Sequence, residues 1–477
     1  MIYIITISLY LFILIGIGIY KSGKIKTQSD FSVAGRSLTP WILVGTMLAT
    51  WIGTGSILGN AGKTYATGLA GLMLPIGGVL GIILLTQIAG KVRSFEKFTV
   101  PEIIGDRFGP VAGMLSVIAL VLAYLVIVSY QYNAGGAVLE TVLLDGNGNP
   151  LLSAEMATII AAIFIITYTM LAGLVSVAYT DVGNGIIMTL SLSIAFPILW
   201  FKAGGWDGMT VAFGQMGKSN HMQFWGVYST MDIVNFCLPP FLLVLGDANM
   251  YQRFFASKDA KGAKRATIIL VVAVAVIELL IIASAWVSSS MIPDAVNGRH
   301  VLIYAAHQLL PPFIGAIMLT TIIGIIISTA DSYLLVPATT LIRDIYMNYI
   351  NPKANEKHIV LMSRMVVLGL GLIAYLVSRG FAESAGFFER ALYAYTIYGA
   401  AITPSLVAAL FWKSASKAGA ISSIIGGTIM TLIWKEAAFM RNIIPENIYN
   451  NTDEVLPAIM VSVICLVVFS YWKKDKV

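Results

Sequence analysis

Charged residues are scarce in this chain. Only 11% of its 477 residues are Asp, Glu, Lys or Arg, and 58% are hydrophobic, whereas a soluble domain carries about 25% charged residues. The two cysteines lie in separate apolar runs and the four histidines are scattered, so neither a disulfide framework nor a metal site is indicated. No nucleophile–base pair is found either. These absences argue against an enzyme and favour a polytopic membrane protein.

Long apolar runs fill most of the chain. Windows of about 20 residues predict an all-α membrane protein with about thirteen transmembrane helices. The first run lacks a small-residue cleavage site and is followed by lysines, so we expect a retained helix rather than a signal peptide. The predicted spans are 2–20, 41–65, 69–90, 112–135, 155–174, 179–201, 232–255, 266–290, 311–340, 360–378, 385–411, 417–434 and 455–472.

The distribution of basic residues predicts the orientation. With the N-terminus outside, the loops on the inner side hold 22 of the 30 Lys and Arg residues, Arg253 among them, and the outer side keeps 8. We therefore expect an external N-terminus and a cytoplasmic C-terminus in the cell membrane. The net charge of +6 then needs no nucleic acid partner. The longest loops without a helical pattern, 136–154 and 203–231, are expected outside.

Two spans carry helix-breaking residues at membrane depth. The second contains Gly53, Gly55 and Gly59 around polar side chains, and the seventh contains Pro239-Pro240 followed by Gly246-Asp247. Breaks inside a membrane are tolerated only where they face protein or a water-filled cavity. Interrupted spans in matching positions of two halves indicate a transporter's binding site. Here they lie five spans apart, as an inverted five-plus-five repeat requires.

A carboxylate lies in the most apolar run. Ser328, Asp331 and Ser332 fall at i, i+3 and i+4 of the ninth span, on one side of a helix. A charge at that depth costs about 2.5–3.5 kcal/mol and is functional by default. The cluster predicts oxygen ligands for a small cation. A structural hydrogen bond of Asp331 to a neighbouring helix is the alternative.

Six stretches together resemble the sodium:solute symporter family. They are DFSVAGRSLTPW (30–41), TMLATWIGTGSILGNAGKTYATG (46–68), FTVPEIIGDRFGP (98–110), TYTMLAGLVSVAYTDV (167–182), NMYQRFFASKDAKGAKRA (249–266) and ISTADSYLLVPATTLIRDIY (327–346). The resemblance implies two inverted five-helix repeats with broken first and sixth core helices, alternating access and Na⁺ coupling. The expected parts are an extra N-terminal helix (1–22), the repeats (41–201 and 232–411) and two C-terminal helices with a basic tail (417–477).

The resemblance also implies ion ligands, and hard cations prefer such oxygens. The main Na⁺ site takes the backbone carbonyls of Ala49, Ile52 and Ile325 with the hydroxyls of Ser328 and Thr329. A candidate second ion site combines Asp181, Asp331 and Ser332. Two-sodium members use hydroxyls where Asp331 stands, so the number of Na⁺ ions stays open, and Asp331 could also strengthen one site or carry a proton.

The resemblance is weakest at the solute position, where Trp51, Ser56 and Asp247 are the candidate contacts. The polar residues of sugar carriers are missing, and Trp51 is more similar to the choline-carrying branch. A Trp face attracts a desolvated quaternary ammonium by about 2 kcal/mol or more. Packing of Trp51 on the third span and capping of a half-helix by Asp247 are the alternatives. The role of Glu278 in the eighth span is left open.

Together these features predict a Na⁺-coupled symporter that imports a small polar organic solute. An amine, a quaternary ammonium or an amino acid is favoured. The alternatives are a proton-coupled transporter of the same fold and a Na⁺ symporter for organic acids or sugars. The sequence predicts nothing about the oligomeric state.

Overall fold

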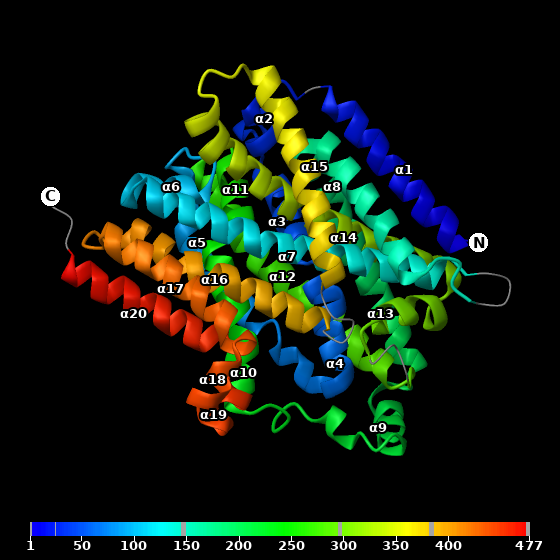
Figure 1. Cartoon of the computed structure of the whole chain (residues 1–477). Coiled ribbons are helices and arrows are strands. Elements are labelled where there is room, and N and C mark those ends of the chain that lie inside the picture. The colour runs from blue at the N-terminus through cyan, green and yellow to red at the C-terminus, as the bar shows by residue number, and fades with distance from the viewer. Residues whose placement is uncertain (1, 24, 145–148, 294–297, 381–385, 474–477) are drawn as a thin grey trace.

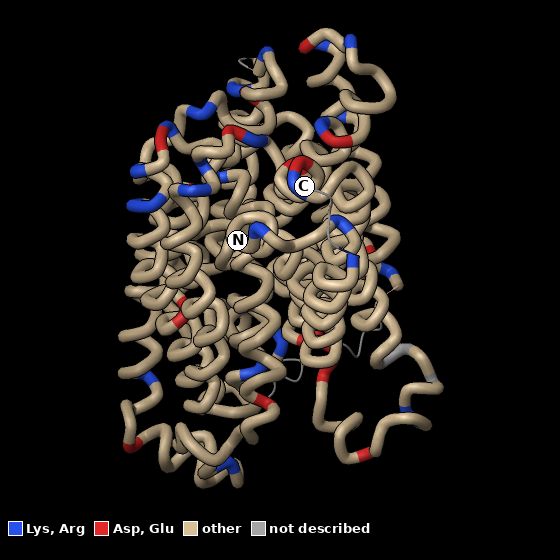
Figure 2. The backbone as a smooth tube through the Cα atoms, turned by 90° about the vertical axis from the view of Figure 1, so that its left-hand side faces the viewer, with Lys and Arg blue, Asp and Glu red and all other residues tan. Residues whose placement is uncertain are grey.

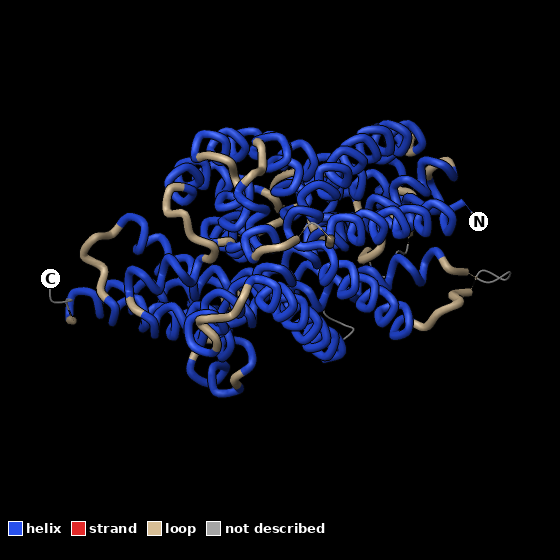
Figure 3. Tube along the Cα trace, turned by 90° about the horizontal axis from the view of Figure 1, so that it is seen from above, coloured by secondary structure: helices blue, strands red, loops and turns tan. Residues whose placement is uncertain are grey.

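The chain folds almost entirely into helices. The computed structural model describes residues 2–23, 25–144, 149–293, 298–380 and 386–473, shown in Figure 1. Within these ranges the strand-type contacts are two isolated bridges, Leu38–Ser257 and Leu144–Pro150, and Figure 3 shows helices joined by loops. The predicted all-α class is confirmed.

Eleven helical segments of the described ranges are long and apolar enough to span a membrane, and a bent pair makes a twelfth. The bent pair joins α3 (Pro40–Trp51) to η2 (Gly55–Asn60), α4 (Ala61–Thr67) and η3 (Gly68–Met73), at an angle of 50°. The eleven are α1 (Ile2–Ser22), α5 (Ile76–Arg93), α7 (Pro110–Val142), α8 (Ala154–Lys202), α10 (Thr230–Gly246) with α11 (Ala248–Ala256), α12 (Ala260–Ser289), α14 (Pro312–Thr340) with η6 (Leu341–Ile350), α15 (Glu356–Gly380), α16 (Phe387–Phe411), α17 (Lys417–Glu436) and α20 (Val455–Trp472).

Helix α8 accounts for the difference from the thirteen predicted spans. It runs for 49 residues, but Gly173 inside it has φ 57° and ψ 171°, which is not helical. A side chain at Gly173 would also meet Ile25 and Phe31. The predicted spans 155–174 and 179–201 are therefore two helices that meet at this glycine.

Both predicted helix breaks are present. Helix α3 ends at Trp51, and Ile52 is extended with φ −76° and ψ 93°. Helix α10 ends at Gly246, and Asp247 has φ −57° and ψ 110° before α11 begins. Pro239 and Pro240 lie inside α10 without ending it. The chain is thus interrupted at Ile52 and at Asp247.

The two loops predicted without helical structure are partly helical. Helix α7 continues to Val142 because Gly135 and Gly136 are packing glycines: a side chain there would meet Ala161 and Thr158 of α8. Residues 145–148 lie outside the described residues. The remaining short helices are α2 (Gln28–Val33), η1 (Ala34–Arg36), α6 (Val100–Phe108), α9 (Gly205–Gln215), η4 (Ser219–Met222), α13 (Val301–Tyr304), η5 (Ala305–Leu309), α18 (Ala438–Ile443) and α19 (Glu446–Asn451).

Helix α14 occupies the centre of the bundle. In its most apolar window 78% of the residues are buried, against 17% for α1 and 28% for α20. It contacts α7, α8, α1 and α3. Ser328 and Asp331 therefore lie where protein surrounds them, whereas α1 and α20 present most of their apolar surface outward.

The two termini lie on opposite sides of the molecule (Figure 1), as an odd number of crossings requires. Lys and Arg gather mainly in the upper part of Figure 2. This agrees with the charge asymmetry of the loops, although the assignment of that end to the cytoplasm stays a prediction. The basic tail at 474–477 lies outside the described residues.

Close helix packing yields the first prediction. A Cβ atom at Gly77 of α5 would lie 1.9 Å from the backbone oxygen of Cys237 in α10, whereas one at Gly183 of α8 would meet nothing within 4 Å. Overpacking typically costs about 1–3 kcal/mol. We expect Gly77→Ala to lower the melting temperature of the purified protein by several degrees. Gly183→Ala is the matched control and should leave it unchanged; equal values for both variants would contradict this packing.

Candidate ion and solute sites

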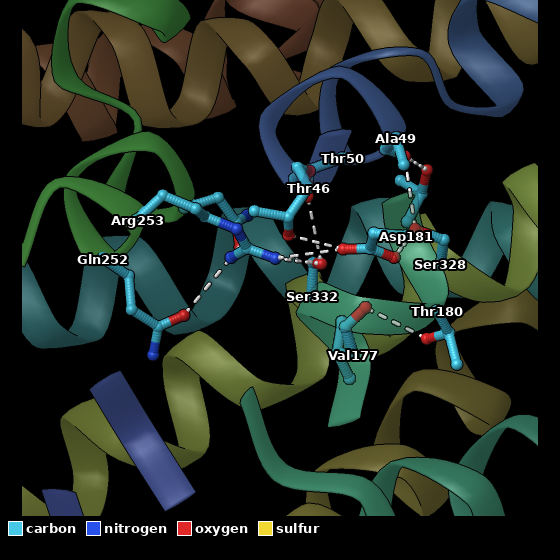
Figure 4. A network of polar contacts seen from close by, with 12 residues as sticks. Thr46, Ala49, Thr50, Val177, Thr180, Asp181, Gln252, Arg253, Ser328 and Ser332 are labelled. Atoms are coloured by element: carbon cyan, nitrogen blue, oxygen red, sulfur yellow. Dashed lines mark hydrogen bonds and ion pairs between the residues drawn. The ribbon is translucent and has the colours of Figure 1, made fainter. Parts of the chain in front are cut away.

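The break in α3 lies directly against α14. The backbone oxygen of Ala49 accepts hydrogen bonds from Ser328 Oγ and from Thr329 Oγ1, both at 3.4 Å (Figure 4). Because α3 ends two residues later, carbonyls in its last turn lack the amide partners of a continuing helix. The structure thus brings Ala49, Ser328 and Thr329 together, as predicted for oxygens of the main Na⁺ site.

Glycine permits this close approach. A Cβ atom at Gly53 would lie 2.9 Å from both the Oγ1 and Cγ2 atoms of Thr329. Ile52 follows the last turn of α3, Ile325 precedes Thr329 by one turn of α14, and each of the two is buried. Their assignment as carbonyl ligands stays a prediction.

Asp181 of α8 adds a negative charge beside these oxygens. Its carboxylate accepts a hydrogen bond from Thr46 Oγ1 at 2.6 Å and another from Ser328 Oγ, and its side chain is fully buried. Arg253 Nη2 of α11 lies 4.0 Å from the Asp181 carboxylate. A charge-assisted network therefore joins four helices (Figure 4).

Arg253 differs from the expectation that placed it in an inner loop. Its side chain is fully buried, and its Nη2 donates to Ser332 Oγ at 2.6 Å. The sequence gives only a weak indication of this, since a basic residue at the end of an apolar run resembles a loop residue. Ser332 also lies 3.2 Å from Thr50 Oγ1.

The three residues of the candidate second ion site are not all brought together. Asp331 Oδ1 accepts a hydrogen bond from Thr169 Oγ1 at 2.5 Å, in the first part of α8. Ser332 is instead bonded to Arg253. Successive residues of an α-helix differ by about 100° in direction. Asp331 and Ser332 therefore contact different neighbouring helices, although both lie about one turn after Ser328.

A second feature is a cavity on the other side of the α3 break. Trp51, Ser56 and Glu278 line it, and a side chain at Gly78 of α5 would lie 2.6 Å from the Trp51 ring. Trp51 thus packs on α5, which agrees with the alternative that it packs on the third predicted span. It also lines the cavity. The aromatic lining is completed by Phe236, Phe388 and Tyr395.

Glu278 is the charged group of this cavity. Its Oε1 accepts a hydrogen bond from Ser56 Oγ at 2.5 Å, and its Oε2 accepts one from Asn60 Nδ2 at 3.1 Å. The side chain is buried. A lone carboxylate in an apolar span indicates function in general, but its hydrogen-bond partner Asn60 and its cavity neighbour Tyr395 were not found from the sequence.

Asp247, the third candidate solute contact, lies at the break between α10 and α11. Its carboxylate accepts hydrogen bonds from the Asn249 amide at 3.1 Å and from the Tyr124 hydroxyl, so it caps α11. Tyr398 donates to the Gly246 carbonyl at 2.7 Å and accepts from the Ala248 amide at 3.2 Å. Asp247 therefore stabilises the second helix break, and it does not line the cavity with Trp51, Ser56 and Glu278.

Comparison with known proteins identifies the family of this chain. The model of the sodium:solute symporter family matches residues 31–427. The chain belongs to this family. It is a multi-pass membrane transporter with Na⁺ as its coupling ion, and the predicted inverted-repeat fold with two broken helices is confirmed.

Curated members of the family align with nearly the whole chain. The osmoregulated proline transporter OpuE of Bacillus subtilis is 24% identical over 98% of this chain and 94% of its own. A sodium/proline symporter of Staphylococcus aureus (strain bovine RF122 / ET3-1) is 25% identical over 98% and 92%. These relatives are named for proline, and the preference for the choline-carrying branch stays a prediction.

Solved structures of symporters share the fold. A Na⁺-coupled sialic acid symporter in a substrate-bound, outward-open state superimposes with a TM-score of 0.82 over 100% of this chain and 99% of its own, at 17% identity. A nucleobase-cation-symport-1 family transporter in a closed conformation gives a TM-score of 0.55 over 94% and 96%, at 12% identity. At such identities these similarities concern the fold alone.

The network around Asp181 yields the second prediction. Breaking a buried ion pair by removing one partner typically costs about 3–5 kcal/mol, because the other charge is left uncompensated. We expect Asp181→Asn and Arg253→Gln each to lower the melting temperature strongly. The double variant should be destabilised by clearly less than the sum of the two, as measured by thermal unfolding in detergent. Additive losses would show that the two side chains are not coupled.

Proposed function

We propose that a Na⁺ ion binds between the break of α3 and the middle of α14. Its ligands are the carbonyls of Ala49, Ile52 and Ile325 and the hydroxyls of Ser328 and Thr329. The observation that carries the proposal is the approach of both hydroxyls to one carbonyl, 3.4 Å each, at a helix end. Oxygen ligands suit a hard cation, and Asp181 supplies a neighbouring negative charge through Ser328.

A second cation is proposed only as an extension of this site. Arg253 contacts both Asp181 and Ser332. Asp331 would have to leave Thr169 to join them. A single Na⁺ is therefore the simpler reading, with Asp331 serving as a structural partner of α8 or as a proton carrier.

For the solute we propose a small organic molecule with a positively charged amino group, as in an amine or an amino acid. Glu278 supports a cation, because its carboxylate lies in a cavity lined by Trp51, Phe236 and Phe388. Aromatic faces also attract cations. An organic acid would meet like charge here, and a sugar would find few hydrogen-bonding groups. The proline relatives agree with an amino acid.

Transport is proposed to follow alternating access, with repeats at 41–201 and 232–411 moving relative to each other and both ligands released into the cytoplasm. One charge crossing about 100 mV releases ~2.3 kcal/mol, and a tenfold Na⁺ gradient adds ~1.4 kcal/mol. Together they support accumulation of the solute by roughly several hundred-fold. One Na⁺ is thus energetically sufficient.

The third prediction tests the ion site. Ser328→Ala and Thr329→Ala each remove one proposed ligand, and we expect each to raise the Na⁺ concentration for half-maximal uptake at least tenfold in proteoliposomes. Thr320→Ala is the matched control, because its hydroxyl bonds only the Ala316 carbonyl of the same helix. Wild-type Na⁺ dependence in both Ser328→Ala and Thr329→Ala would refute the site.

The fourth prediction tests the solute cavity. Glu278→Gln keeps the shape but removes the charge, and a hydrogen bond to a charged group contributes about 1.5–3 kcal/mol. The half-saturation constant for the solute should rise tenfold or more, while Na⁺ affinity is kept. Glu155→Gln, which neutralises an exposed acid, is the control.

The solute itself is found by a thermal-shift screen of amines, amino acids, organic acids and sugars, with and without Na⁺. Stabilisation grows with ligand saturation, so a true solute raises the melting temperature more when Na⁺ is present. A solute without positive charge, or unchanged affinity in Glu278→Gln, would contradict the assignment of Glu278.

A further inference from the structure

A basic cavity of ≈ 660 Å³ shares no lining residue with the proposed ion and solute sites. It is formed where the end of α1 meets the start of α15, both near the top of Figure 1. Among the described residues that line it there is no carboxylate. The polar lining consists of Ser22, Lys26, Asn355, Lys357, His358 and Arg364.

The lysines of this cavity, Lys26 and Lys357, are exposed and form no direct ion pair with a described residue. The acids closest in sequence, Glu356 and Asp30, accept hydrogen bonds from the backbone amides of Gln28 at 2.7 Å and Thr27 at 3.0 Å and keep their negative charges. The lining itself carries the three cations Lys26, Lys357 and Arg364, so the balance of the cavity is positive.

Arg364 forms the inner part of the cavity. Its Nη2 donates to Ser22 Oγ at 2.7 Å, which ties α15 to the end of α1. Its Nε is buried and has no hydrogen-bond partner among the described residues. A buried donor left unsatisfied costs about 1–3 kcal/mol. An anion that accepted a hydrogen bond from this Nε would remove that cost.

An apolar stripe begins at the same cavity. Leu361 lines it and is 54% exposed, and Met365, Leu372 and Leu376 are 46–64% exposed. At about 100° per residue, these four positions of α15 lie within about 60° of one another on the helix surface. The hydrocarbon chain of a ligand bound in the basic cavity would thus meet apolar side chains that continue along α15.

We propose that this cavity binds the phosphate headgroup of an anionic phospholipid, with an acyl chain along the exposed stripe of α15. Basic pockets between helix ends at a membrane surface suit such headgroups. Free phosphate would use the charges alone and would leave the stripe without a role. The bound lipid would join α1, which stands outside the two proposed repeats, to α15 of the second repeat.

The test is a titration of the purified, delipidated full-length protein with dioleoyl-phosphatidylglycerol, followed by native mass spectrometry. Each basic residue near an anionic headgroup strengthens binding about fivefold. Lys26→Ala/Lys357→Ala should therefore weaken binding about 25-fold, and Lys357→Ala alone about fivefold. The matched control Lys261→Ala/Lys264→Ala removes two exposed lysines of α12 and should change the affinity less than twofold.

Three results would overturn the proposal. Equal losses in both double variants would reduce the effect to general surface charge. Equally tight binding of dioleoyl-phosphatidylcholine would exclude recognition of an anionic headgroup. Displacement of the lipid by inorganic phosphate at equal concentration would identify a soluble phosphate as the ligand.

Discussion

The structure depends on a helix that stops in the middle of the bundle. Unpaired backbone groups at that depth are tolerated only where protein or water satisfies them, and here α14 provides the partners. Ser328 and Thr329 both donate to the Ala49 carbonyl, and Gly53 has no side chain that would keep α14 away. This contact is made by the span with the largest buried share among those of the described ranges.

The two helix breaks are stabilised in different ways, which separates their functions. At the break between α10 and α11, protein side chains bind the free backbone groups. Asp247 accepts from the Asn249 amide and from the Tyr124 hydroxyl, and Tyr398 donates to the Gly246 carbonyl. The break in α3 opens toward the hydroxyls of α14 on one side and toward the cavity with Glu278 on the other. Ligand chemistry is therefore concentrated at the first break.

Much of the fold could be predicted from the sequence, because apolar run length and glycine or proline at membrane depth are direct consequences of the bilayer. The meeting of Ala49 with Ser328 and Thr329 was predicted through the family resemblance. Side-chain direction was left open at two positions, and the structure shows the alternative at each: Asp331 accepts from Thr169 of a neighbouring helix, and Asp247 caps α11. The burial of Arg253 was not predicted. Such choices depend on three-dimensional neighbours that no local pattern contains. The helical part of 136–154 was missed because packing glycines resemble loop glycines.

Ser328 carries one hydroxyl hydrogen but has two acceptors, the Ala49 carbonyl and the Asp181 carboxylate. It can satisfy only one of them fully at a time. When its hydrogen points to Asp181, its lone pairs and the Ala49 oxygen both become available to a metal cation. The rotation of a single C–O bond would then connect the arrival of the ion to the charge on α8 and, through Arg253, to the half-helix α11.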